Sequence, residues 1–332
     1  MKREESCSAR LGRVGGQAVL EGVMMKSGDR TALAVRDESG AIRTSVDTHT
    51  SVRKKYKFLN IPLVRGVVNF VETMILSYNT LMQSADMLGI DDAAEDSKFE
   101  AWLRSKWGDK FMAVLMGIAT VLGLVVGLGL FLYLPAFVTK WLDSLLGGIG
   151  WFRNVIEGVM KIAIFVAYIA LCSLMKEMRR TFEYHGAEHK SIACYESGME
   201  LTPANAMKCT RFHPRCGTSF LFVILILSIL VNSLISWDNL LLRVALKVLL
   251  LPVIVGLGFE FIMYAGKHTN VFTRILSAPG LWMQRITTRE PDEAQLEIAI
   301  TALKLAMPDE FPAEEKEAES GENSADAEIA NG

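Results

Sequence analysis

Two histidines and a glutamate form the pattern in this chain that is best suited to chemistry. They are His185, Glu188 and His189, within the segment RRTFEYHGAEHKSIACYES. On an α-helix, residues four positions apart lie on one face, and a residue at position i+3 lies at the edge of that face. Both imidazoles could therefore bind one divalent metal ion, with the glutamate beside it.

The order H-x-x-E-H is that of the inverzincin metalloproteases, in which the glutamate activates a metal-bound water. A divalent ion can lower the pKa of such a water to about 7. The pattern therefore predicts a metal-dependent hydrolase of amide, ester or phosphoester bonds, with Glu188 as general base and zinc as the cofactor. Alternatively, Glu183, Glu188 and Glu196 could bind Mn²⁺ or Mg²⁺ through oxygen atoms.

A mononuclear site needs a third protein ligand, and four residues are candidates. The sequence HPRC at 213–216 is the first choice, since it offers His213 or Cys216. Glu196 is a local alternative. The third ligand of the inverzincins is a glutamate well downstream, and Glu260 lies 71 residues after His189.

The competing interpretation is that the segment containing the H-x-x-E-H pattern has no catalytic role. Aromatic and imidazole side chains such as Tyr184, His185 and His189 also serve as anchors at a membrane interface. Gly186 lowers the helix propensity by about 1 kcal/mol relative to alanine, and a helix break there would separate the two histidines. The alternative function is therefore a non-enzymatic membrane scaffold or regulatory factor, with a structural metal site or none.

Four apolar segments must position this pattern. Of the 332 residues, 51% are apolar and 22% charged, and the apolar residues are concentrated in blocks. About 20 apolar residues span the hydrocarbon core of a bilayer. We therefore predict an α-helical polytopic membrane protein with about four transmembrane helices, at residues 111–139, 158–175, 216–237 and 242–264.

The charges of the connecting loops orient these spans. Residues 1–110 hold 17 Lys and Arg and the 176–215 connection holds seven, whereas the connection after the first span has only Lys140 and Arg153. The positive-inside rule then places both termini and the 176–215 loop in the cytoplasm. The lipid bilayer is the expected partner, and a protein partner or a homo-oligomer stays open. A net charge of -2 gives no reason to expect nucleic acid.

The N-terminal residues 1–100 are predicted to form a small cytoplasmic α+β domain. Alternating residues and a glycine-containing turn indicate a β-hairpin at 31–47. The segment GGQAVLEGVMM at 15–25 is interpreted as one further strand. Helical spacing predicts an amphipathic helix over 61–88, which we expect to pack on the domain core, with the membrane surface as the alternative.

The rest of the chain is predicted to form a membrane domain, a cytoplasmic segment and a tail. Residues 101–265 are expected to form the membrane domain with its cytoplasmic loop, and residues 266–307 a cytoplasmic segment that ends in a helix. The last 25 residues, 308–332, contain nine acids and one lysine without periodicity, and are predicted to be a disordered acidic tail.

Four segments together resemble the bacterial YqhQ-like family of unknown function. They are GGQAVLEGVMM (15–25), RTFEYHGAEHKSIACYE (180–196), HPRCGTSF (213–220) and PGLWMQRITTREPDEAQLEIAI (279–300), within a resemblance that covers most of residues 10–306. The resemblance implies a metal-dependent enzyme of the bacterial cytoplasmic membrane. It also adds Gln17 and Glu21 as site residues, and we expect both to position the substrate. A plain strand with one solvent-facing side is the alternative for this motif.

Overall fold

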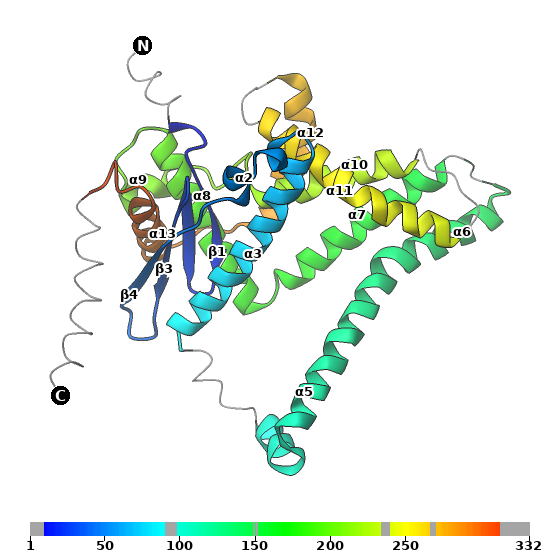
Figure 1. Cartoon of the computed structure of the whole chain (residues 1–332), viewed down its shortest axis with the longest axis horizontal. Coiled ribbons are helices and arrows are strands. Elements are labelled where there is room, and N and C mark those ends of the chain that lie inside the picture. Colours follow the sequence, from blue (N-terminus) through cyan, green and yellow to red (C-terminus); the bar gives the residue numbers. More distant parts are fainter. Residues whose placement is uncertain are drawn as a thin grey trace. The chain divides into compact units, whose positions relative to one another are not determined.

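A computed structural model describes residues 10–89, 98–148, 150, 152–233, 240–265 and 270–312 (Figure 1). The chain divides into two compact units that are discontinuous in sequence. Among the described residues, the first unit takes those up to Leu88, Leu171–Val223 and those from Val255 onward, and the second takes the remainder. The contiguous domain boundaries at residues 100, 265 and 307 stay a prediction.

A four-stranded antiparallel sheet of order β1-β2-β3-β4 lies in the first unit. Its strands are β1 (Val14–Val19), β2 (Gly22–Ser27), β3 (Arg30–Arg36) and β4 (Ile42–Thr48). The hairpin expected at 31–47 is β3 and β4. The single strand expected at 15–25 was wrong, because the chain turns at Leu20 and Glu21 and pairs Val19 with Gly22. Glu21 adopts a φ of 47°, which is uncommon for residues other than glycine, so its residue type does not predict this turn.

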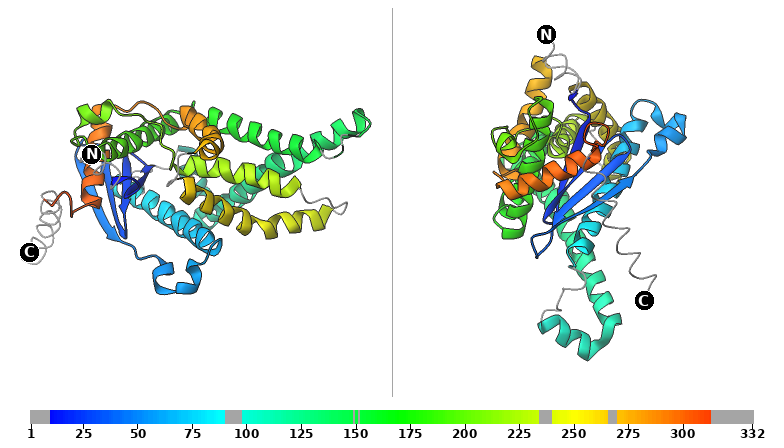
Figure 2. Two further views of the ribbon diagram at one scale, coloured as in Figure 1. Left: turned by 90° about the horizontal axis from the view of Figure 1, so that it is seen from above. Right: turned by 90° about the vertical axis from the view of Figure 1, so that its left-hand side faces the viewer.

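Helices cover both faces of the sheet (Figures 1 and 2). On one face the strands form a buried apolar core with α8 (Lys176–Glu196), the short α9 (Pro203–Met207) and α13 (Glu293–Ala306). On the other face, α3 (Val64–Met87) packs on the strands through a smaller apolar cluster. The sheet is therefore the rigid platform that holds α8, the helix of the H-x-x-E-H pattern.

The helix expected over 61–88 is α3, but the structure buries little of its apolar surface. Leu76 and Met87 pack against the strands, and the positions buried beside them are small, such as Ser84 and Ala85. Met74, Ile75 and other long apolar side chains of α3 are half exposed. The side facing the sheet is thus narrower than the amphipathic pattern suggested.

The other helices complete the description of the chain. They are α2 (Val52–Lys55), η1 (Lys57–Asn60), α5 (Lys98–Leu128), the π-helical η2 (Gly129–Tyr133), α6 (Leu134–Leu145), α7 (Phe152–Cys172), α10 (Gly217–Ser233), α11 (Leu240–Ala265) and α12 (Val271–Thr287). The C-terminal helix expected before residue 307 is α13. It begins with a capping box in which Asp292 and Gln295 each accept from the other's backbone.

Two helical stretches, Gly117–Leu145 and Phe152–Cys172, are long and apolar enough to cross a membrane. The second carries the ion pair Glu157–Lys161, 2.7 Å long, whose carboxylate is buried. Gly217–Val231 and Leu249–Ala265 are apolar but shorter. The end of the third predicted span, at 234–237, lies outside the described residues, as does the acidic tail from residue 313.

Helix α8 runs without interruption through Gly186, so the break that this glycine could have caused does not occur. The segment between α12 and α13 crosses the helix there, and the backbone N–H of Arg289 donates to the carbonyl of Phe182 at 2.8 Å. A Cβ on Gly186 would lie only 1.9 Å from the carbonyl oxygen of Arg289. The glycine is therefore required by this close crossing.

We expect Gly186→Ala to lower the thermal stability of the purified protein. In an isolated helix the change would stabilise by about 1 kcal/mol. Here the added methyl group must push away a backbone oxygen that would lie at 1.9 Å, which puts the cost at or above the upper end of the usual range of about 1–3 kcal/mol. The melting temperature should fall by several degrees. Gly123→Ala in α5 is the matched control, since no described atom lies within 4 Å of its Cβ position. An unchanged melting temperature for Gly186→Ala would contradict the crossing.

Candidate metal centre

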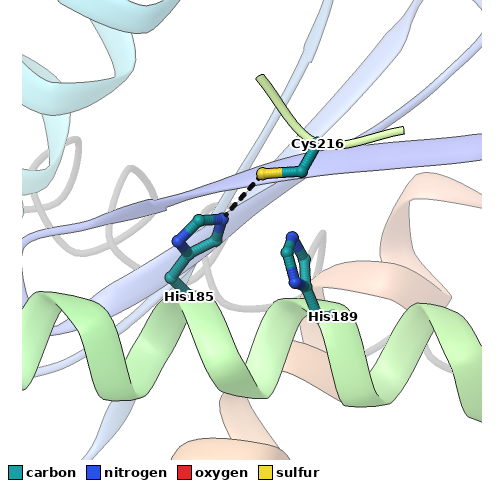
Figure 3. A group of neighbouring side chains, drawn as sticks. All are labelled: His185, His189 and Cys216. Atoms are coloured by element: carbon teal, nitrogen blue, oxygen red, sulfur yellow. Dashed lines mark hydrogen bonds between the residues drawn. The ribbon is translucent and has the colours of Figure 1, made fainter. Parts of the chain in front are cut away.

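Three side chains from two parts of the chain converge on one point (Figure 3). His185 and His189 project from the same side of α8, and Cys216 lies directly before α10. Their ligand atoms all lie within 4.8 Å of one another, with 3.2 Å between His185 Nε2 and Cys216 Sγ. Nitrogen and sulfur ligands of a tetrahedral zinc ion are about 3.5 Å apart. Two imidazoles and a thiol at this spacing fit such an ion.

Backbone carbonyls set the tautomer of both histidines. His185 Nδ1 lies 2.8 Å from the carbonyl oxygen of Thr287, and His189 Nδ1 lies 2.6 Å from that of Arg211. A carbonyl oxygen only accepts, so each Nδ1 must carry the proton. Once its Nε2 is deprotonated, each ring presents a lone pair on that nitrogen. Metal-binding histidines characteristically hold their second nitrogen in this way.

The histidines and the cysteine are largely buried, and the imidazole and thiol groups shift each other's pKa. His189 is 1% exposed and Cys216 8% exposed. Burial alone would raise the pKa of the Cys216 thiol, but the two imidazoles beside it hold that pKa well below its usual value. Burial would lower the pKa of His185, but Cys216 and Glu188 raise it to about 9. The site thus favours the thiolate, which is the metal-binding form of cysteine.

Glu188 lies beside the three ligand atoms, with its Oε2 3.9 Å from His185 Nε2. It is 5% exposed, and burial raises the pKa of its carboxyl against the opposing effect of the histidines. Gly16 of β1 makes room for it, because a Cβ there would meet Glu188 Cγ at 3.1 Å and the carbonyl oxygen of Met24 at 2.6 Å. The glycine-rich N-terminal motif therefore contacts the centre through its backbone.

His213 lies next to the ligand group and outside it. Its ring is 5.6 Å from that of His189, and its Nε2 is 3.5 Å from Glu196 Oε2. Glu196 also pairs with Arg215 and accepts from the backbone N–H of Gly12 at 2.9 Å. From the HPRC segment, the structure therefore brings Cys216 to the two histidines, while His213 and Glu196 form a neighbouring polar pair.

The remaining candidates have other partners. Glu260 accepts from Arg65 Nε at 2.6 Å and does not belong to the ligand group formed by the described residues. Gln17 donates to Thr80 of α3 at 2.5 Å. Glu21 pairs with Arg180, on the N-terminal half of α8. Both side chains of the N-terminal motif thus join the sheet to a helix, and their role in positioning a substrate stays a prediction.

Sequence reasoning missed the residues that act through their backbone. The carbonyls of Thr287 and Arg211 orient the two histidines, and no side-chain pattern signals them. Gly16 was signalled better, since glycines inside an apolar strand often mark a close approach of another segment, and Gly16 makes one.

Comparisons with known proteins identify the family of this chain. The family described as "Protein of unknown function (DUF1385)" matches residues 61–309. The chain belongs to this family. This chain is 32% identical over 291 residues to "Uncharacterized protein YqhQ" of Bacillus subtilis (strain 168). The aligned region covers 86% of this chain and 89% of that protein. No solved structure matches. The resemblance to the YqhQ-like family is confirmed, and the matched region contains all three ligand residues.

We expect the purified full-length protein to carry about one zinc ion per chain. His185→Ala, His189→Ala and Cys216→Ser should each lose most of this zinc, because removing even a group that only supports a metal ligand lowers metal affinity about 10–100-fold. His213→Ala is the matched control and should keep its metal. Elemental analysis of chelator-free protein in detergent gives the stoichiometry. Zinc that is lost from His213→Ala and retained by Cys216→Ser would refute the ligand set.

Proposed function

We propose that this protein is a metal-dependent hydrolase of the bacterial cytoplasmic membrane. The observation that carries the proposal is the buried Glu188 carboxyl beside a three-ligand group. Catalytic zinc sites have three protein ligands and leave a position for water or substrate, whereas structural sites have four. When bound, the ion supplies the Lewis acidity that makes a water nucleophilic near neutral pH.

In this proposal Glu188 acts as the general base. Its burial raises the pKa of the carboxyl and so increases its basicity at neutral pH. The carboxylate removes a proton from the attacking water as the oxygen adds to an acyl or phosphoryl centre. It then delivers this proton to the departing amine or alcohol oxygen, so that the two products together gain one water.

The donor set favours zinc over the harder ions. Thiolate and imidazole suit zinc, whereas manganese and magnesium prefer oxygen ligands. Two of the glutamates considered for such an ion are engaged elsewhere: Glu196 with His213, and Glu183 as an acceptor from Gln295 at 3.2 Å. The zinc assignment therefore rests on Cys216.

Glu188→Gln should abolish hydrolysis while leaving the metal in place. The amide keeps the size of the side chain but cannot accept the proton, and general-base catalysis contributes about 10²–10⁴-fold. The rate would be measured on chromogenic esters and phosphoesters and on peptide amides, in parallel with zinc content. Glu183→Gln is the control, because it removes a carboxylate of the same helix outside the ligand group.

Burial of the centre favours a second candidate, a structural zinc site in a non-enzymatic membrane scaffold or regulatory factor. Glu188 would then be the fourth ligand, which its position 3.9 Å from His185 Nε2 allows. The same variant separates the two functions without a known substrate. Glu188→Gln keeps its zinc if the residue is a base and loses zinc if it is a ligand.

The membrane location is part of the proposal. Two helical stretches are long and apolar enough to cross a bilayer, and the apolar α10 and α11 would supply two further spans. Lys and Arg are concentrated in residues 1–110 and 176–215, which favours a cytoplasmic position for both termini and for the metal centre.

This topology predicts the labelling of single introduced cysteines. Ser39→Cys, in the exposed turn between β3 and β4, should be protected from a membrane-impermeant maleimide in intact cells and react after permeabilisation. Leu146→Cys, which is 67% exposed at the end of α6, should react in intact cells. Labelling with the opposite pattern would reverse the orientation, and protection of both would contradict the spans.

A further inference from the structure

A basic and aromatic segment precedes α3. Between Asp47 and Glu72 the chain has no acidic residue and five basic ones. The basic residues are Arg53, Lys54, Lys55, Lys57 and Arg65. Four of them lie within α2 and η1, and this local excess of positive charge contrasts with the net charge of -2 for the whole chain.

Large apolar side chains on the same segment are exposed. Phe58 is 68% exposed, Ile61 54% and Tyr56 45%, and Lys55 lies over the ring of Tyr56 at 5.5 Å. Both views in Figure 2 show the stretch around α2 projecting from the sheet and helices of the first unit. We call residues 52–61 the basic-aromatic segment.

Contacts with α3 fix the segment in place. Arg53 donates to Asn69 at 3.2 Å, and Ser51 donates to Glu72 at 2.8 Å. Beside these contacts α3 carries a stripe of exposed apolar side chains at helical spacing. The stripe consists of Val71, Met74, Ile75, Tyr78, Leu81 and Met82, which are 39–64% exposed. The basic-aromatic segment therefore belongs to a larger apolar surface.

The N-terminus of α3 also packs on an apolar helix. A Cβ on Gly66 would lie 2.7 Å from Phe259 Cβ and 3.0 Å from Gly256 Cα of α11, and Arg65 pairs with Glu260. Residues 249–265 of α11 form one of the shorter apolar helices. The basic-aromatic segment thus ends where α3 meets a helix of membrane-like composition.

We propose that the basic-aromatic segment docks on an anionic phospholipid surface. Tyr56, Phe58 and Ile61 would enter the headgroup region, and Lys55 and Lys57 would contact lipid phosphates. Lysines are attracted to an anionic leaflet. Tyrosine rings prefer the interface, and apolar side chains such as Phe and Ile enter the boundary between headgroups and acyl chains. Two other occupants fit less well. The acidic C-terminal residues of this chain would complement the positive charge but not the exposed apolar side chains, and nucleic acid would leave the exposed apolar stripe of α3 uncovered. The proposal rests on the proposed membrane location and is independent of the metal centre.

Hydrogen–deuterium exchange of the full chain in lipid nanodiscs tests this docking. Backbone amides of residues 52–61 should exchange at least tenfold more slowly in discs of phosphatidylglycerol than in discs of phosphatidylcholine. Lys55→Glu/Lys57→Glu should remove this difference, because each lysine near an anionic surface contributes about a factor of five. Lys55→Arg/Lys57→Arg is the charge-matched control and should retain it. Phe58→Ser should weaken the protection, and Phe58→Leu should preserve it.

Equal exchange in both discs would overturn the docking. If the amides are protected in both, a second copy of the chain, its acidic tail or another macromolecule covers the segment; if they are exposed in both, nothing does. Either result leaves the proposed spans intact. A chain that associates with neither disc would overturn the membrane location together with the docking, and zinc content would still report on the centre separately.

Discussion

A backbone carbonyl holds the Nδ1 proton of each histidine of α8, which leaves both Nε2 atoms available for one metal ion. Thr287 supplies one carbonyl at the end of α12, and Arg211 supplies the other from the loop after α9. Both acceptors are fixed in turn, since the Arg211 side chain donates to the Thr288 carbonyl. The loop and α12 are thus joined directly behind the ligands, so the centre depends on the first unit being assembled as a whole.

Helix spacing was enough to bring His185 and His189 together, because a period of 3.6 residues is a local property. The third ligand was not predictable to the same degree. His213 and Cys216 are close in sequence, and only the backbone path before α10 decides which of them faces α8. Glu260 pairs with Arg65, which lies 195 residues away, and no rule of spacing relates two such positions.

The elements of the fold also divide into those that the local sequence specifies and those that depend on contacts between distant residues. The β3–β4 hairpin and α13 were predicted, since alternation specifies the first locally and an apolar stripe at helical spacing specifies the second. The β1–β2 turn was missed because Glu21 adopts a positive φ without being glycine. For α3 the periodicity was correct, but a periodic pattern does not say how much of an apolar face its neighbours cover. Met74 and Tyr78 remain exposed for that reason.

The close crossing at Gly186 has a consequence for how such centres are recognised in other genomes. The short motif is constrained twice. Its histidines must face Cys216, and its glycine must leave room for the Arg289 backbone. A side chain at the second position of the motif therefore displaces the crossing backbone and destabilises the fold. A search pattern should read H-G-x-E-H followed by a cysteine 27 residues after the second histidine. This pattern is narrower than the H-x-x-E-H of the inverzincins, whose second position is unspecified.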